Sequence, residues 1–207
     1  AWRLTVQRFL QAASGLAAAH DAQVIHRDFK PDNVLIDGTG RVVVVDFGLA
    51  RQSDIELTTS PLSSKRSTLS GTPAYLSPER WQGRAADVAS DQFSFCVSLY
   101  ECVAGRLPFE TRDLEARVAE VRAGPTSLAS TGVNRRVELA IRRGLSLEPT
   151  ARWPSMAALR DELEVALETP RRRQTYVVGG AVAVVALGLF GLSVAQSRAR
   201  CDAADAP

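Results

Sequence analysis

The sequence predicts a mainly α-helical domain with one small β-hairpin, followed by a single membrane-spanning helix. Apolar residues recur at helical spacing in several separate stretches, and β-branched runs are confined to one short region, which predicts the helical domain and its hairpin. An uncharged apolar run near the end of the chain predicts the span. Because 45% of the 207 residues are hydrophobic, the chain has enough apolar surface to bury a core.

The first helix is expected over residues 3–20, and His20 at its end is expected to cap the helix or face solvent. Two short β-branched runs follow at 34–36 and 42–45. They are separated by the Asp-Gly-Thr-Gly sequence of residues 37–40, which is typical of a tight turn. This pattern predicts the hairpin.

Residues 52–70 are rich in Ser and Thr and lack periodicity, so we expect a long loop there. Structure resumes at 91–104, which is apolar nearly all round and therefore predicts a helix buried at the centre of the domain. Further helices are expected over 113–122, 134–145 and 155–167, separated by Gly and Pro.

The apolar run over 176–195 would span about 30 Å as a helix, which matches the thickness of a hydrocarbon core. The alternative is a buried globular helix, but such helices seldom extend this far without a polar position. We therefore divide the chain into a helical domain (1–168), a basic juxtamembrane linker (169–175), the membrane span and a short external tail (196–207).

Composition excludes some classes of function. The 25 basic and 23 acidic residues leave a net charge of +2, so the dense basic field of a nucleic-acid binder is absent and we expect no nucleic-acid partner. Cys96, Cys102 and Cys201 have neither the spacing of a zinc site nor the even count of a disulfide framework. Cys96 and Cys102 are six residues apart on an expected helix, which points them to different faces.

Three oxygen-bearing side chains lie on loops at the ends of the expected strands, where side chains can converge: Asp28, Asn33 and Asp46. Carboxylate and amide oxygens are hard ligands of the kind that Mg²⁺ requires. Lys30, two residues after Asp28, adds a positive charge at the same place. This set could serve a reaction of a metal-bound phosphate.

These residues belong to an ordered series of motifs that resembles the protein kinase family. His-Arg-Asp-Phe-Lys-Pro-Asp-Asn at 26–33 resembles the catalytic loop, and Asp-Phe-Gly at 46–48 resembles the magnesium-binding motif. Gly-Thr-Pro-Ala-Tyr-Leu-Ser-Pro-Glu at 71–79 resembles the segment that closes the activation loop, with Ser77 where the family usually has Ala. The resemblance covers residues 1–168 and implies the carboxy-terminal lobe of a kinase.

The resemblance implies ATP and Mg²⁺ as cofactors and a role for each residue. Asp28 would be the catalytic base, and Lys30 would neutralise charge on the transferred phosphoryl group while binding the nucleotide. Asn33 and Asp46 would hold the magnesium ions that bridge the ATP phosphates. Lys30 and Thr72 together resemble the serine/threonine branch, so Ser and Thr hydroxyls of proteins are the expected substrates.

The resemblance also implies structural roles. Glu79 is expected to pair with Arg152 near the end of the lobe. Asp91 is expected to brace the backbone of the catalytic loop. His26 is expected to pack and hydrogen-bond within that loop rather than to transfer protons, although a His beside an Asp also occurs in hydrolases.

Regulation is expected at Arg27, because a guanidinium at this point of the family commonly binds a phosphate on the activation loop. Ser64, Ser67 and Thr68 are the candidate phosphorylation sites, and Thr72 is a further regulatory position. The alternative is a polar loop that is merely solvated.

The family's glycine-rich loop does not occur in this sequence, so we expect little kinase activity from the chain as written. A pseudokinase or a membrane-anchored signalling scaffold is the alternative function. The presence of Asp28, Asn33 and Asp46 favours an enzyme, because a scaffold has no physical need for all three.

The order of kinase domain and span resembles the receptor-type serine/threonine kinases of bacteria. Because a kinase uses cytosolic ATP, residues 1–168 are expected in the cytoplasm of a single-pass membrane protein, with lipid as a partner. Small residues at Gly179 and Ala183, and again at Gly191 and Ala195, would permit a homodimer through the span.

Overall fold

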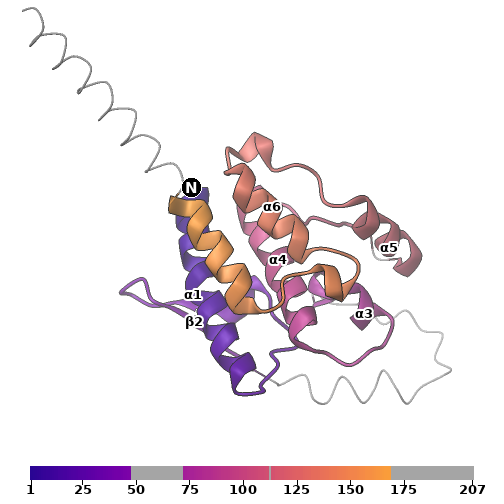
Figure 1. Cartoon of the computed structure of the whole chain (residues 1–207), viewed down its shortest axis with the longest axis horizontal. Coiled ribbons are helices and arrows are strands. Elements are labelled where there is room, and N and C mark those ends of the chain that lie inside the picture. Colours follow the sequence, from indigo (N-terminus) through magenta and orange to yellow (C-terminus); the bar gives the residue numbers. More distant parts are fainter. Residues whose placement is uncertain (48–71, 112, 169–207) are drawn as a thin grey trace, which may run out of the picture. The chain divides into compact units, whose positions relative to one another are not determined.

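The structure, a computed structural model, describes residues 1–47, 72–111 and 113–168 (Figure 1). Apart from the last residue, these belong to the first of the chain's two units, Ala1–Leu167. Helices make up most of this unit, and one two-stranded sheet is present among the described residues. The prediction of a mainly helical domain with a small hairpin is therefore confirmed.

The first helix and the hairpin pack against each other. Helix α1 (Trp2–Asp21) buries one face, because its apolar residues recur three and four positions apart. Strand β1 (Val34–Ile36) pairs antiparallel with β2 (Val42–Val44). The backbone N–H of Val42 donates to Oε1 of Gln11 at 3.0 Å, which fixes the hairpin to α1. The buried residues of α1 are Val6, Phe9, Ala12, Ala13, Leu16, Ala17 and His20.

Helix α4 (Val88–Ala104) is the centre of the unit, and Figure 1 shows it between α1 and α6 (Arg135–Gly144). Every residue from Ser90 to Tyr100 is buried, as the sequence predicts. The helix begins three residues earlier than residue 91 because Asp87 and Ser90 form a capping box, in which each side chain accepts the other's backbone N–H. Gly105 ends it in the left-handed conformation, with φ 71°.

Of the helices that follow α4, α6 packs against it. Asp113 caps α5 (Leu114–Ala123) and Asn134 caps α6 (Arg135–Gly144), and the last described helix covers 156–168. All three agree with the predicted ranges to within about two residues, the usual uncertainty of helix ends. The sequence did not predict α3 (Pro78–Trp81), because one helical turn is too short to show periodicity. Short 3₁₀ turns are η1 (Pro31–Asn33), η3 (Thr72–Tyr75), η4 (Ala129–Thr131) and η5 (Pro149–Ala151).

Aromatic rings join α1, the following loop and α4. The rings of Phe9 and Phe95 are 5.3 Å apart, edge to face, and the rings of Phe29 and Phe95 are 5.5 Å apart. Burying a phenylalanine side chain of this kind contributes about 1.5–3 kcal/mol. The core therefore lies directly beneath the segment 26–33 and holds its apolar side in place.

The prediction for His20 is wrong. Its side chain is buried, and its Nε2–H donates to Oδ2 of Asp91 at 2.9 Å. A buried carboxylate at the start of α4 requires donors, and α1 ends close enough to supply one. Cys96 is buried and Cys102 is exposed, so the prediction that they point to different faces is confirmed.

Several predictions fall outside the described residues. Ser64, Ser67 and Thr68 lie there, as do the linker 169–175 and the predicted span 176–195. Within the part of the chain that the structure describes, no helix has the length and apolar character needed to cross a membrane.

Candidate active site

Two hydrogen bonds bring the end of the hairpin against the segment 26–33. The backbone N–H of Val45 donates to the carbonyl of Asn33 at 3.0 Å, and Nε2–H of His26 donates to the carbonyl of Val45 at 2.9 Å. Asp46 follows Val45 directly, so its backbone lies beside that of Asn33. The structure thereby brings together the two segments that carry the predicted site residues.

Asp28 is tied to its neighbours on both its side chain and its backbone. Nζ of Lys30 lies 2.8 Å from Oδ2 of Asp28, and both side chains are about one-quarter exposed. The Nδ2 amide of Asn33 donates to the backbone carbonyl of Asp28 at 2.8 Å. Since this bond uses the amide nitrogen of a buried Asn33, the amide oxygen is the atom with capacity for a cation.

The backbone is strained on both sides of the site. Arg27 has φ 74° and Asp46 has φ 62°, values that non-glycine residues seldom adopt. Such conformations cost roughly 1–3 kcal/mol each and persist only where the surrounding structure enforces them. No sequence pattern reveals them, and their position at the two predicted functional loops is typical of an active site.

Asp91 enforces the conformation at Arg27. Its Oδ2 accepts the backbone N–H of His26 at 2.7 Å, and its Oδ1 accepts that of Arg27 at 2.8 Å. With the bond from His20, three donors converge on a carboxylate that is 1% exposed. The expected contacts of Asp91 with the backbone of segment 26–33 are present, and His20 is the member of this group that sequence reasoning missed.

His26 itself is fully buried, and its ring lies 4.7 Å from Phe47 and 5.6 Å from Phe29, measured between ring centroids. The ring packs against the two phenylalanines and forms one hydrogen bond, to the carbonyl of Val45, which agrees with the expectation that His26 packs and hydrogen-bonds. Its Nδ1 has no hydrogen-bond partner among the described residues. His26 therefore joins the two loops.

The donor set fits magnesium shared with a phosphate. Among the described residues, no group of three or more His, Cys, Asp or Glu side chains could enclose a metal ion. Mg²⁺ does not need such an enclosure, because it usually binds one or two protein oxygens together with waters and substrate phosphates. The carboxylate of Asp46, which is exposed, and the amide oxygen of Asn33 are donors of this kind.

One face of the hairpin presents apolar side chains to solvent. Leu35 is 53% exposed and lies opposite Val43, which is 40% exposed. Their neighbours Val34 and Val44 form the adjacent cross-strand pair and pack against the core. The alternation of a strand produces the two faces, but the sequence alone did not show that Leu35 and Val43 lie beside the polar site.

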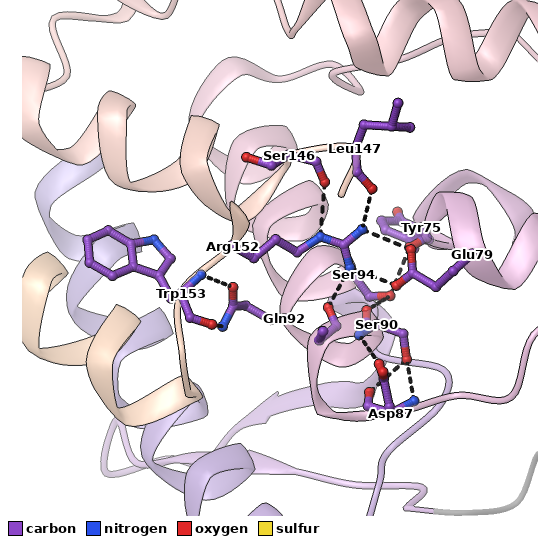
Figure 2. Close-up of polar contacts among 11 residues, drawn as sticks. Tyr75, Glu79, Asp87, Ser90, Gln92, Ser94, Ser146, Leu147, Arg152 and Trp153 are labelled. Atoms are coloured by element: carbon purple, nitrogen blue, oxygen red, sulfur yellow. Dashed lines mark hydrogen bonds and ion pairs between the residues drawn. The ribbon is translucent and has the colours of Figure 1, made fainter. Parts of the chain in front are cut away.

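A second polar cluster also lies near the first turn of α4 (Figure 2). Nη1 of Arg152 binds Oε1 of Glu79 at 2.7 Å, and Nη2 binds Oε2 at 2.8 Å, so the expected ion pair is present. The guanidinium also donates to the carbonyls of Ser146, Leu147 and Ala89. Burial alone would raise the pKa of the Glu79 carboxyl, but the hydrogen bonds and charge of Arg152 outweigh burial and lower the pKa.

The turn η3 is held from two helices. Oγ of Ser94 donates to the carbonyl of Tyr75 at 2.8 Å, and the Tyr75 hydroxyl donates to Oε2 of Glu101 at 2.7 Å. Burial and that carboxylate raise the pKa of Tyr75 above its ordinary value. Arg117 on α5 donates to the carbonyl of Ala74. The sequence predicted a role for this segment, which contains Thr72, but none of these partners.

Comparisons with known proteins agree with this geometry. Residues 3–161 match the family model described as protein kinase domain. The serine/threonine-protein kinase Pkn1 of Myxococcus xanthus is 35% identical over 164 residues, which cover 76% of this chain and 23% of that protein. PksC of Streptomyces coelicolor is 37% identical over 153 residues, with 72% and 27% covered, and PrkC of Bacillus subtilis is 30% identical over 164, with 78% and 24% covered. The chain thus spans about a quarter of the length of these curated relatives, and it belongs to the protein kinase family.

Proposed function

We propose that this chain is the carboxy-terminal lobe of a protein kinase that transfers the γ-phosphoryl group of ATP to Ser and Thr hydroxyls of proteins. The observation that carries the proposal is the pair of hydrogen bonds from Asn33 to Asp28 and from Val45 to Asn33, which join the loops bearing the three oxygen donors. The names of the curated relatives support the choice of Ser and Thr.

In the transfer step, the substrate hydroxyl oxygen forms a bond to the γ-phosphorus, and the bond from that phosphorus to the bridging oxygen breaks, leaving ADP. Asp28 orients the hydroxyl and accepts its proton through the carboxylate, a contribution of about 10²–10⁴-fold for a positioned base. Lys30, 2.8 Å from that carboxylate, places its positive charge beside the transferred group. The hydrogen bond from Asn33 to the backbone carbonyl of Asp28 holds the two residues in a fixed position relative to each other.

Asn33 and Asp46 would hold Mg²⁺, which supplies charge neutralisation at the phosphates when bound. The exposed pair Leu35 and Val43 offers an apolar surface beside these donors, suited to one face of the adenine ring. ATP would thus contact apolar residues with its base and polar residues with its phosphates.

The test is phosphate transfer from radiolabelled ATP to myelin basic protein by the polypeptide that the complete gene encodes. Replacing Asp46 by Asn should abolish transfer, whereas the matched change Asp37→Asn should not. Asp37 is an exposed aspartate in the turn of the same hairpin, where it accepts only local hydrogen bonds from Thr39 and Arg41. Nucleotide binding without transfer by the wild-type protein would instead support a pseudokinase.

We also propose that Arg27 binds a phosphate on Ser64, Ser67 or Thr68, with Thr72 as a further regulatory position. The support is that Arg27 directly precedes Asp28 and that Asp91 fixes its backbone, so a phosphate bound there would act on the catalytic loop. Mass spectrometry of the active protein with no phosphate on these residues would refute this proposal.

A third proposal concerns location. Residues 176–195 hold no charged residue, which supports a membrane span preceded by three arginines and a cytoplasmic kinase domain. Labelling of Cys201 by a membrane-impermeant thiol reagent on intact cells is the expected result, and protection of Cys201 until the cells are lysed would contradict the orientation.

A further inference from the structure

Arg117 of α5 is a buried cation with an unusual set of partners. Its side chain is 2% exposed, and among the described residues it forms no ion pair. Nη1 donates to the carbonyl of Phe109 at 2.8 Å, and Nη2 donates to the carbonyl of Ala74. The guanidinium carbon lies 5.2 Å from the centroid of the Phe109 ring, and Nε has no hydrogen-bond partner in the described structure.

This arrangement is costly for a residue that only packs. Burial of the guanidinium disfavours its charge and lowers the pKa of Arg117, while the negative charge of Glu120 opposes that shift. An apolar side chain of similar volume would fill the same space without leaving Nε unpaired. The contacts of the guanidinium, rather than its packing, therefore distinguish arginine from an apolar residue at this position.

The contact with Ala74 connects α5 to the turn η3. Two successive carbonyls of this turn are held by different helices, Ala74 by Arg117 of α5 and Tyr75 by Ser94 of α4. Ser94 lies one turn after Asp91 on α4, and Asp91 holds the backbone N–H groups of His26 and Arg27, so adjacent turns of one helix hold η3 and the segment 26–33. Arg117 thus sets the backbone of a segment beside the catalytic loop.

We propose that Arg117 is a positioning residue for the protein substrate, which holds the Ala74 carbonyl so that η3 presents a fixed surface to the residues flanking the phosphorylated hydroxyl. This inference rests on the proposed kinase function. It differs from the catalytic assignments because Arg117 has no part in binding ATP or in proton transfer. Loss of the Arg117 side chain should therefore weaken binding of the protein substrate and leave binding of ATP unchanged.

The experiment compares Arg117→Met, Arg117→Lys and the control Arg142→Met in the polypeptide encoded by the complete gene. Arg142 is a partly buried arginine on α6 that binds Glu138 at 3.1 Å, so its loss costs a charged hydrogen bond in a helix that does not contact η3 through it. Four quantities are measured: KM for myelin basic protein, KM for ATP, ATP hydrolysis without protein substrate, and the thermal midpoint.

For Arg117→Met we expect KM for myelin basic protein to rise about tenfold, with KM for ATP and ATP hydrolysis within about twofold of wild type. Lysine should restore part of the loss, because its ammonium can donate to one of the two carbonyls. The control should lower the thermal midpoint and leave both KM values unchanged.

An unchanged KM for myelin basic protein in a folded Arg117→Met variant would overturn the inference and leave the proposed function standing. The inference would also be overturned if KM for myelin basic protein and KM for ATP rose equally in Arg117→Met. A folded Arg117→Lys variant with no recovery of KM for myelin basic protein would overturn it too, since either result indicates a purely structural role. Wild-type protein without any phosphate transfer would refute the proposed function itself, and the two failures are thereby distinguished.

Discussion

The loops around Asp28 and the cluster around Arg152 use charge in opposite ways. Arg152 is 2% exposed, and its guanidinium donates to a carboxylate and to three backbone carbonyls. Asp28 is about one-quarter exposed, and among the described residues Lys30 is its ionic partner, while Asp46 is exposed on a strained backbone. Protein groups satisfy the charges of the Arg152 cluster, whereas the loops around Asp28 keep carboxylate oxygens available for a ligand.

This difference suggests that the two regions have different roles: the Arg152 cluster serves the stability of the fold, and the loops around Asp28 can serve ligand binding. A buried charge destabilises the fold unless protein groups satisfy it, so removing one partner from the Arg152 cluster should destabilise the protein strongly. An exposed carboxylate contributes little to folding and can therefore be committed to a ligand. Asp91 links the two regions, because this buried carboxylate at the start of α4 accepts three hydrogen bonds and holds the backbone of His26 and Arg27, next to Asp28.

The largest effect is expected for Asp28→Asn in the polypeptide encoded by the complete gene. Phosphate transfer should fall about 10²–10⁴-fold because the base is lost, while the free energy of unfolding should change by less than about 1 kcal/mol. Radiolabelled transfer and urea denaturation measure the two quantities. The matched change Asp21→Asn, at an exposed position at the end of α1, should affect neither. A large loss of stability in Asp28→Asn would remove the contrast between the two regions.

Next in size is the loss of stability in Arg152→Met. Removing the guanidinium leaves the Glu79 carboxylate buried without its partner, so the free energy of unfolding should fall by about 3–5 kcal/mol. Arg136→Met is the control, since Arg136 pairs with Glu162 at the surface and its loss should cost less than about 1 kcal/mol. Similar losses in the two variants, measured by urea denaturation, would show that saturation of Arg152 does not matter.

A third prediction concerns how tightly α6 packs on α4. A methyl group at Gly144 would overlap Sγ of the buried Cys96. Gly144→Ala should therefore destabilise the protein by about 1–3 kcal/mol, although alanine in a helix is otherwise favoured over glycine. In a protein that already carries Cys96→Ala, the change Gly144→Ala should cost less stability. A double-mutant cycle by thermal denaturation measures this coupling between the two positions. If the losses of stability in the two single variants simply add in the double variant, Cys96 does not limit the space at Gly144 and the prediction is wrong.

The smallest effect is a pH dependence of the Arg152 cluster. Because the pKa of Glu79 is lower in the folded protein than in the unfolded chain, the unfolded state binds the proton more readily. Its contribution to stability is complete above the ordinary glutamate pKa of about 4.3 and is lost as the pH falls through the folded pKa. The difference in unfolding free energy between wild type and Glu79→Gln should thus narrow below about pH 4 and be constant from pH 6 to 8. A difference that widens on acidification would contradict this sign.

Much of the fold could be predicted because its signals are local. Helical spacing, the Asp-Gly-Thr-Gly turn and the caps Asp113 and Asn134 are each contained in a few consecutive residues. The order of the motifs also predicted the ion pair of Glu79 and Arg152, 73 residues apart, through the resemblance to kinases.

The contacts that the sequence did not predict are long-range or conformational. His20 reaches Asp91 across 71 residues, and Arg117 reaches the Ala74 carbonyl across 43. Every residue has a backbone carbonyl, so no residue pattern could indicate that Arg117 binds the carbonyl of Ala74. The left-handed conformation of Arg27 depends on bonds from the distant Asp91, and although Asp adopts this conformation more readily than most residues, nothing in the sequence distinguishes Asp46 from the other aspartates.

The most direct test of the shared metal and phosphate site is paramagnetic broadening of backbone amide NMR signals by Mn²⁺ with ATP, Mn²⁺ replacing Mg²⁺. We predict that the amide signals of residues 28–30, 32, 33 and 46 broaden first, and that Asp46→Asn removes the effect while Asp37→Asn preserves it. Broadening centred elsewhere, or equal broadening in wild type and Asp46→Asn, would contradict the assignment of Asn33 and Asp46 as the metal-binding pair.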